Sequence, residues 1–533
     1  FRYNWVNTLT YNKTLGDHKI GFVAGYEAQQ NTDNSFYGQG IDLAHVYFGE
    51  RNIITGTLGT QYTGGGYEVR ALTSTFGRVN YSFLDRYLLT ATLRNDQISS
   101  LPWDNQAATL PGISLGWRIS EEGFFANSEG LAFVDDFKLR GGYAEVGNVE
   151  IGAFPYAGVY APRLYGDNSG LYFSQVGNPN LTFETSKKTN IGLDLTMFAN
   201  RLSITADWFL NDVDNLILAI PVPPSQGIPG NQINTNVGKL NNKGWELTIA
   251  SDIISKEHFS WNSSLNLSFV KNEILQLGGS PIVDTYHKTE VGHSIGKFFG
   301  YEYYGVNPTN GFPVFVKQKE GKLAQINPSD GAWTEFFPND PSNVSTSIAA
   351  LTSVDDKVYL GESNPTWYGG FNNTLTYKDF DFSVLMTFAG GHKVYNLTRQ
   401  STLTTQSYAN NSREMLDAWS PDNTNTDVPI LWAGQTSRIN QAGHLNSRFL
   451  EDGKYLRFQN ISLGYRLPVT MLQKIHVSGA RIYASVQNAF VLTNYMGIDP
   501  EISSSVTTNR NASLDDNTNP VPRTFTFGIN LNF

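Results

Sequence analysis

Long runs in which apolar and polar residues alternate constrain this chain more than any other feature. Runs of this kind cover residues 87–94, 190–197, 202–208, 264–269 and 524–533. Successive side chains of an extended strand point to opposite faces, so each run makes a strand with one apolar and one polar face. The runs approach the ~9–11 residues with which a tilted strand crosses a bilayer, and about fifteen of them can be counted.

Short and long connections between these runs follow one another in turn. The short ones fall at Leu15–Asp17, Leu84–Arg86, Ser120–Asp135, Ala199–Arg201, Ile254–Phe259, Lys378–Asp381 and Pro468–Gly479. The long ones cover Asn31–Val69, Gln97–Pro111, Gly147–Phe183, Asn211–Asn241, Asn272–Asn364, Gly391–Leu450 and Thr493–Val521. Ile295–Val306 also has the pattern of a strand, but we assign it to a long connection. A membrane-spanning strand at this place would reverse the direction in which every later strand crosses the membrane. This order is typical of outer-membrane barrels, which have short periplasmic turns and long extracellular loops.

The physics of the bilayer explains the pattern. Every backbone polar group in hydrocarbon must pair within the protein, so a spanning sheet has to close. Apolar side chains then face lipid and polar side chains face the lumen. A lipid-facing Lys or Arg at mid-depth costs ~2–4 kcal/mol, so Lys138 and Arg140 are predicted to face inward, opposite Phe137 and Leu139. The sequence predicts an all-β transmembrane antiparallel barrel. A soluble propeller, the main alternative, repeats every ~40–50 residues, and no such repeat is visible.

Composition argues against several other classes. The mean hydropathy is −0.30, and no run reaches the ~18 apolar residues of a membrane-spanning helix. The net charge of −10, without basic clusters, argues against nucleic acid as a partner. Aromatic residues reach 13% and charged residues only 16%, unlike a disordered chain. There is no cysteine, which excludes disulfides and thiolate metal sites.

Several segments, in order from about Val69 to the end, are similar to the SusC/RagA family of TonB-linked outer-membrane transporters of Bacteroidota. The matching segments are Arg86–Ala91, Gly116–Glu122, Lys138–Tyr143 with Gly147-Asn148, Gly177–Pro179 with Leu181–Lys188, Asn236–Gly238 with Asn242–Leu247, Asn364–Phe371, Leu456–Tyr465, Gln487-Asn488 and Phe533.

The resemblance implies a plugged barrel of ~22 strands, of which residues 1–533 would be the C-terminal part. Because Phe1 lies inside a strand-like run, we expect an N-terminal part ahead of it. The resemblance implies that this part holds the plug, the first strands and the site for a TonB-type energy transducer. The resemblance also implies a SusD-like surface lipoprotein as a lid and oligosaccharides or peptides as substrates. Outer-membrane lipids and the barrel-assembly machinery would be further partners. The assembly machinery would recognise a C-terminal signal formed by the alternating apolar residues Phe525, Phe527, Ile529, Leu531 and Phe533.

No catalytic, metal or cofactor site is predicted. The carboxylate pairs Asp135-Asp136, Asp355-Asp356 and Asp515-Asp516 are adjacent residues, which point apart in a strand and otherwise lie in solvent. His287 and His293 lack a third metal ligand nearby, and Gly64–Gly66 lacks the Lys-Ser/Thr of a phosphate loop, so it indicates a flexible loop. Relatives often carry an Asp/Asn/Gly-rich stretch of which only Asn327–Gly331 and Asp355-Asp356 remain here. An ion site is therefore not carried over from them.

Aromatic side chains in the long connections are the candidates for substrate contact, because sugars stack on Trp and Tyr. They are Trp103, Tyr156, Tyr165, Tyr172, Trp333, Tyr408 and Trp432. Each of them could instead pack against its own loop or the lid. The favoured function is active import through the barrel. The alternatives are a structural subunit of a larger outer-membrane assembly and a surface enzyme, and the second would need a catalytic constellation that the sequence does not show.

Overall fold

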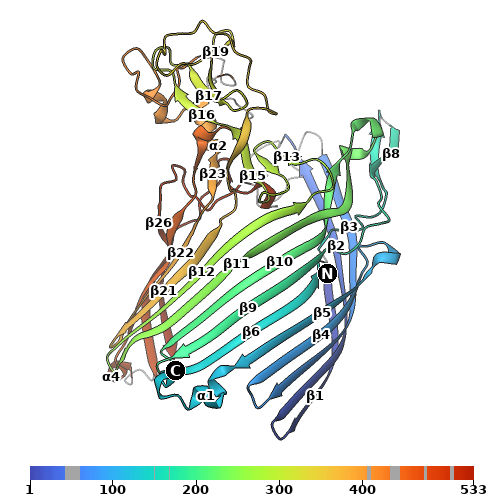
Figure 1. Ribbon diagram of the computed structural model, residues 1–533, viewed down its shortest axis with the longest axis vertical. Helices are drawn as coiled ribbons and strands as arrows, with labels where there is room; N and C mark the ends of the chain where they lie inside the picture. The colour runs from blue at the N-terminus through green and yellow to red at the C-terminus, as the bar shows by residue number, and fades with distance from the viewer. Residues whose placement is uncertain are drawn as a thin grey trace. The chain divides into compact units, whose positions relative to one another are not determined.

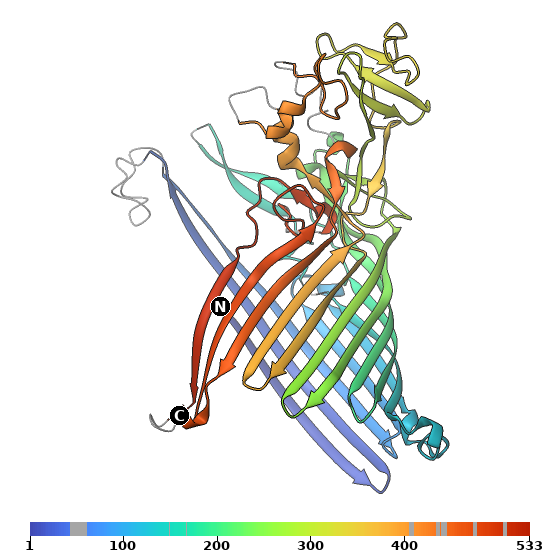
Figure 2. The same cartoon turned by 90° about the vertical axis from the view of Figure 1, so that its left-hand side faces the viewer.

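A computed structural model describes residues 1–42, 61–148, 150–166, 168–404, 410–432, 438, 445–472, 477–504 and 509–532. Its main element is a 15-stranded sheet, which Figures 1 and 2 show as a row of long neighbouring strands. In sheet order the strands are β1 (Arg2–Leu15), β2 (His18–Gly40), β3 (Gln61–Phe83), β4 (Tyr87–Ile98), β5 (Ala107–Arg118), β6 (Val134–Gly147), β9 (Thr185–Met197), β10 (Leu202–Pro221), β11 (Gln232–Lys256), β12 (Phe259–Gln276), β21 (Trp367–Tyr377), β22 (Phe380–Gly390), β25 (Tyr455–Arg466), β26 (Gly479–Thr493) and β28 (Thr524–Asn532). The predicted number of strands and the all-β class are confirmed.

The register of the strands confirms the two faces of the sheet. We call a set of residues that pair across neighbouring strands a rung of the sheet. Leu89 of β4 pairs with Leu115 of β5, and in the next rung Thr90 pairs with Ser114, so apolar and polar rungs alternate. On β6, Arg140 pairs with Gly116, one residue away from the apolar rung of Leu115. Every rung therefore places its side chains on the same face as the rungs two residues away, and Arg140 shares the polar face with Ser114.

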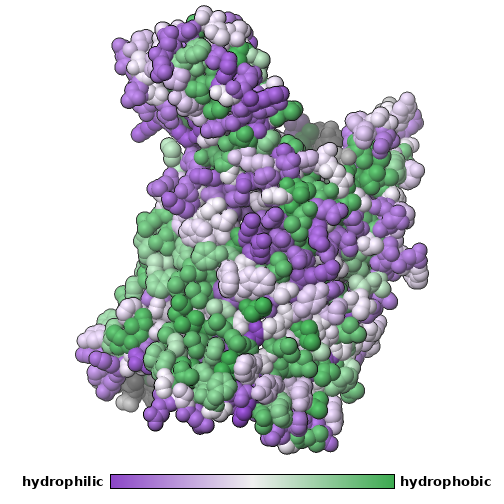
Figure 3. Space-filling model, viewed as in Figure 1, coloured by the Kyte–Doolittle hydropathy of each residue, from purple (hydrophilic) through white to green (hydrophobic). Residues whose placement is uncertain are grey.

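Apolar residues of the other face are open to the surroundings. Leu115 is 60% exposed, Leu93 56% and Phe527 of β28 80%. In Figure 3 hydrophobic residues gather over the lower part of the strands on the face in view, and hydrophilic residues prevail above them. A soluble sheet would bury such residues in a core, so a lipid-facing surface explains their exposure.

The short connections lie where they are predicted, but two long ones are shorter than expected. β2 and β3 stay paired up to Gly40 and Gln61, and β10 and β11 extend to Pro221 and Gln232, well into the predicted excursions Asn31–Val69 and Asn211–Asn241. Polar side chains on both faces are compatible with pairing once the strands have left the hydrocarbon, so loss of alternation does not mark the end of a strand.

Gly64–Gly66 was predicted to be a flexible loop, and this prediction is wrong. The three residues belong to β3 and pair with Tyr37, Phe36 and Ser35 of β2. A Cβ at Gly64 would lie 2.5 Å from the ring of Tyr37, so the ring covers the bare backbone of the glycine. Glycine here permits close packing of an aromatic side chain on the strand rather than mobility.

The chain forms two compact units. The first comprises residues 1–127, 138–191 and 209–240, and the second residues 128–137, 192–208 and 241–533. The first unit also holds a separate hairpin, β7 (Val159–Tyr165) with β8 (Asn168–Gln175).

The second unit holds three small sheets in its long connections. They are β13 (Ile282–Val283), β14 (His287–Thr289), β15 (Lys297–Tyr301) and β20 (Lys357–Gly361); β16 (Tyr303–Val306), β17 (Pro313–Lys317), β18 (Lys322–Ile326) and β19 (Trp333–Glu335); and β24 (Leu450–Asp452), β23 (Lys393–Asn396) and β27 (Leu514–Asp515). Because Ile295–Val306 supplies β15 and β16, its predicted place outside the main sheet is confirmed.

Three α-helices lie wholly within the described residues: α1 (Gly123–Ala126), α2 (Leu397–Thr404) and α4 (Val469–Leu472). Among the described residues, no helix is both long and apolar enough to span a membrane.

Candidate substrate path and outer cap

Charged side chains on the polar face of the first unit form ion pairs across neighbouring strands. The guanidinium of Arg94 on β4 lies 2.8 Å from Glu27 of β2 and 2.5 Å from Asp96, and it donates to the hydroxyl of Ser74 on β3 at 2.7 Å. Glu27, Ser74 and Asp96 occupy one rung of the sheet, so the register itself assembles this network. The polar face is thus a hydrophilic wall whose charges are compensated locally.

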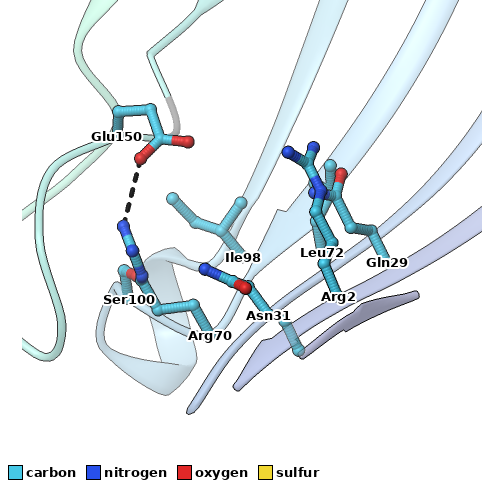
Figure 4. A pocket seen from close by; sticks show the side chains of 9 residues that line it. Arg2, Gln29, Asn31, Arg70, Leu72, Ile98, Ser100 and Glu150 are labelled. Atoms are coloured by element: carbon cyan, nitrogen blue, oxygen red, sulfur yellow. Dashed lines mark hydrogen bonds and ion pairs between the residues drawn. The ribbon is translucent and has the colours of Figure 1, made fainter. Parts of the chain in front are cut away.

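A pocket opens on the same face beside Arg2 at the start of β1 and Ile98 at the end of β4 (Figure 4). Two rungs that lie two residues apart build it, Arg2–Asn31–Arg70 and Gln29–Leu72–Ile98, and Ala71, Ser100 and Glu150 complete the lining. All three nitrogens of the Arg70 guanidinium face a carboxylate: Nε lies 2.8 Å from Glu68, Nη1 3.0 Å from Glu150 and Nη2 3.3 Å from Asp33.

The floor of this pocket is firmly supported. Ile98 is 3% exposed and belongs to a buried cluster with Leu101, Leu181 and Phe183, against which Leu72 packs. A well-packed apolar cluster keeps its side chains in place, so the pocket is preformed. It combines amide, hydroxyl and guanidinium groups over an apolar floor, a composition typical of sites for polar organic ligands.

The long connections of the second unit form a folded cap and not separate flexible loops. We use the term outer cap for the described residues of 277–366, 391–454 and 494–523. Its core contains Phe298 from the first of these connections and Tyr395 and Phe449 from the second, with Leu514 of the third packed against it. Parallel pairing of β23 with β27 joins the second and third connections. Since no single connection contains the whole core, the cap is stable only as a unit.

Buried ion pairs fasten the outer cap. The guanidinium of Arg457 on β25 lies 2.5 Å from Asp499 and 2.9 Å from Glu501, and the side chains of Arg457 and Asp499 are only 5% and 4% exposed. Arg399 of α2 lies between Glu414 and Glu451, at 2.5 and 3.4 Å. The pKa of Arg399 is raised because these carboxylates outweigh the effect of burial. Removing one partner of such a buried pair would leave an uncompensated charge out of water, which is strongly destabilising.

His287 sits inside the outer cap as a neutral imidazole. It is 1% exposed, stacks on Phe298 with ring centroids 4.6 Å apart, and places Nε2 2.9 Å from the carbonyl oxygen of Ala512. A carbonyl can only accept, so Nε2 carries the proton and donates it. Burial, together with nearby Arg510, lowers the pKa of His287 to about 4, against the raising effect of the hydrogen bond to Ala512.

The outer cap is expected to loosen when the pH falls. Between about pH 6.5, where an exposed histidine titrates, and about pH 4, the opened segment binds more protons than the folded one, so stability falls with pH. From pH 7 to pH 5 the loss should be roughly 2 kcal/mol. The protection of residues 509–515, measured as the hydrogen-exchange rate relative to the intrinsic rate at each pH, should fall accordingly. In a His287→Gln variant, which is neutral at both pH values, this protection should not change; an equal loss in that variant would contradict the assignment.

The structure describes six of the seven aromatic candidates. Trp103 is 87% exposed, in a connection of the first unit, and Tyr165 is 86% exposed on the hairpin β7–β8. Tyr172 lies under the Arg163 guanidinium, and Tyr156 packs against the Ile98 cluster. In the second unit Trp333 packs against the small core of Tyr301, Phe315 and Ile326, while Trp432 is 37% exposed. Tyr408 lies outside the described residues.

The sequence left open that each aromatic residue packs against its own connection instead of substrate. The contacts of Tyr156 and Trp333 agree with that alternative. Whether any of the seven aromatic residues contacts substrate stays a prediction.

Asn327–Gly331, the remnant of the Asp/Asn/Gly-rich stretch, forms a turn. The side chains of Asn327 and Asp330 accept hydrogen bonds from nearby backbone N–H groups, and the Arg438 guanidinium donates to the carbonyl oxygens of Pro328 and Ser329. Within the described parts of the chain, no group of three or more His, Asp or Glu side chains could hold a metal ion. The terminal Phe525, Phe527, Ile529 and Leu531 form the exposed face of β28, whereas Phe533 lies outside the described residues. Their role as an assembly signal stays a prediction.

Sequence reasoning missed the Arg70 pocket and the fastening of the outer cap. Arg70, Asn31 and Gln29 lie on different strands, and only the register brings them together. The single sequence signal was the position of Arg70 at the border between a polar excursion and an alternating run. Nothing in the sequence near Arg457 points to Asp499, 42 residues later.

An antiparallel sheet with an exposed apolar face, a polar opposite face and long outer connections defines an outer-membrane β-barrel protein. The family model of the TonB dependent receptor-like β-barrel matches residues 1–489, and the chain belongs to this family. It is therefore placed in the outer membrane, with its long connections extracellular, among receptors and transporters rather than enzymes.

Relatives extend the match over the whole chain. TonB-dependent receptor P3 of Formosa agariphila is 33% identical over 548 residues, which cover 99% of this chain and 52% of the relative. TonB-dependent receptor SusC of Bacteroides thetaiotaomicron is 29% identical, covering 98% of this chain and 49% of the relative. The chain thus spans about half the length of these relatives.

Among solved structures, the RagAB peptide transporter matches with a TM-score of 0.82 and 23% identity, over 100% of this chain and 55% of that chain. This match shows that the two share a fold. The predicted resemblance to the SusC/RagA family is confirmed.

Proposed function

We propose that the chain is the barrel part of an active importer, which takes up an oligosaccharide or a peptide across the outer membrane by TonB-dependent transport. The observation that carries the proposal is the similarity to TonB-dependent receptors, SusC included, over nearly the whole chain. The hydrophilic inner wall supports it, because it offers polar cargo a path through an apolar membrane. The energy transducer would act on parts of the longer relatives that this chain does not cover.

We further propose that a SusD-like lipoprotein covers the extracellular mouth. The shared fold with RagAB, described as a peptide importer in closed and open states, is consistent with a moving lid. The hairpin β7–β8 offers a surface for such a partner. Leu171, Leu164 and Tyr160 are 75%, 69% and 66% exposed on a sheet of only two strands. A lone hairpin is marginally stable, and clustered exposed apolar residues mark interaction sites.

Deleting the gene for the full-length protein tests the import function. The deletion strain should lose growth on one polymer or peptide mixture as sole carbon source and grow normally on its monomers. Plasmid-borne wild-type protein should restore growth. Normal growth on every source, together with a defect in assembly of other outer-membrane proteins, would contradict import and favour the structural alternative.

Purification of the tagged full-length protein in mild detergent tests the lid. A surface lipoprotein should co-purify in a ratio near one to one, and Leu164→Ser/Leu171→Ser should weaken its retention. Recovery of the barrel without any lipoprotein would contradict this part of the proposal.

A further inference from the structure

We infer that the Arg70 pocket receives an uncharged polar segment of the cargo and that the mouth of this barrel discriminates against polyanions. The inference rests on the proposed import function and narrows its substrate class. Sulfated and uronic acid polymers are excluded by it, whereas neutral oligosaccharides and peptides without net negative charge are admitted. Two independent observations support it, one local and one global.

The local observation is that three carboxylates surround Arg70. Arginine recognises a carboxylate or sulfate through paired N–H donors that point at two acceptor oxygens. Here Nη1 and Nη2 donate to Glu150 and Asp33, and Glu68 lies 2.8 Å from Nε, so an anionic ligand would have to compete with three carboxylates that are already in place. Together with Arg2 of the pocket lining, the group holds two positive and three negative side chains. An added anion would meet net repulsion within the ~8 Å over which charges interact in physiological salt.

The remaining surface of the pocket suits an uncharged ligand. Asn31, Gln29 and Ser100 contribute amide and hydroxyl groups, and Leu72 and Ile98 form the apolar floor. The amide of Asn31 donates to Asp33 at 2.9 Å, which fixes its orientation. Polar groups held rigidly above an apolar floor are able to orient a ligand that has both hydroxyl or amide groups and an apolar side.

The global observation is the distribution of charge along the chain. The extracellular connections between sheet strands, residues 41–60, 99–106, 148–184, 222–231, 277–366, 391–454 and 494–523, contain 26 Asp and Glu and 16 Lys and Arg. The sheet and its inner turns contain 22 of each, so the whole net charge of −10 is extracellular. A mouth of one sign repels cargo of the same sign during encounter.

The first test compares growth of the full-length deletion strain on neutral polymers (laminarin, levan, starch, xylan), on a peptide mixture and on polyanions (alginate, pectin, carrageenan, chondroitin sulfate). The inference predicts a defect confined to a neutral polymer or the peptide mixture. A defect on a polyanion would overturn it while leaving the import function intact. Normal growth on all sources would instead overturn the import function, so the two failures are distinguishable.

The second test acts on the pocket in the full-length protein. Gln29→Ala/Asn31→Ala should lower uptake of the identified cargo roughly tenfold, because two hydrogen-bonding groups are lost. The matched control Asn12→Ala/Ser114→Ala, on the same polar face outside the pocket, should leave uptake unchanged. Equal effects of both pairs, at equal outer-membrane levels, would overturn the assignment of the pocket.

The third test reverses the discrimination. Asp33→Asn/Glu68→Gln/Glu150→Gln leaves Arg70 without its carboxylates, and all three replaced side chains are well exposed, so folding should be preserved. Purified wild type should not bind fluorescent dextran sulfate, whereas the triple variant should bind it in low salt, and neither should bind it in high salt. Binding by the wild type that equals binding by the triple variant would overturn the inference.

Discussion

Ile113→Arg should remove most of the full-length protein from the outer membrane, whereas Ser114→Arg should leave its level nearly unchanged. The two residues are neighbours in the middle of β5, and the register places Ile113 on the rung of Ala91 and Tyr143 and Ser114 on that of Thr90 and Gly142. Arginine on the lipid face near mid-depth costs ~2–4 kcal/mol, but on the inner face it meets water. The pair is therefore matched in sequence position, strand and introduced charge.

Quantitative blotting of outer-membrane fractions measures this effect, and heat-modifiable mobility on gels reports whether the barrel is folded. Ile113→Ala serves as a further control, because it removes the apolar side chain without adding charge and should retain most of the protein. Equal loss with Ile113→Arg and Ser114→Arg would mean that the two faces of β5 do not differ in environment.

The second large effect is expected in the outer cap. Arg457→Met should leave the buried carboxylate of Asp499 without its partner, which typically costs 3–5 kcal/mol. Local opening of residues 494–523 should rise at least ~100-fold, since each 1.4 kcal/mol is a factor of ten. Hydrogen exchange of that segment and its cleavage by added protease measure the opening. The level of protein in the membrane should hardly change, because the ladders of β25 with β22 and β26 do not need this side chain.

A double variant separates the ion pair from simple loss of packing. Arg457→Met/Asp499→Asn removes both charges, so no buried charge is left unpaired, and it should open less than Arg457→Met alone. If the double variant opened as much as Arg457→Met alone, or more, the coupling between Arg457 and Asp499 would be refuted.

The strands of the sheet could be predicted from sequence because lipid and water impose their demands residue by residue. Successive rungs of β4 and β5 are apolar and polar in turn. The local pattern is therefore enough to assign Leu89 to one face of the sheet and Thr90 to the other. The ends of the strands could not be predicted in the same way. Where β2 and β3 leave the membrane, Ser35 and Gly66 remain paired although alternation has ended.

The outer cap and the Arg70 pocket could not be predicted because they depend on contacts between distant residues. His287 meets Ala512 across 225 residues, and Ser513 donates to the carbonyl oxygen of Ser363 across 150. No periodicity encodes such pairs. The pocket requires the register of four strands at once, and an error of one residue in any strand would turn Arg70 or Asn31 to the other face. The aromatic candidates were chosen by residue type alone, which does not reveal what each side chain packs against.

The most direct measurement exploits the absence of cysteine from the chain. Single cysteines placed in turn at residues 111–117 of the full-length protein, labelled with a nitroxide in lipid bilayers, report contact with dissolved oxygen, which concentrates in lipid, and with a water-soluble nickel complex. We expect a period of two, with positions 111, 113, 115 and 117 exposed to oxygen and positions 112, 114 and 116 exposed to nickel. Equal access of both reagents at neighbouring positions would contradict the assignment of a lipid-facing and a water-facing side to this sheet.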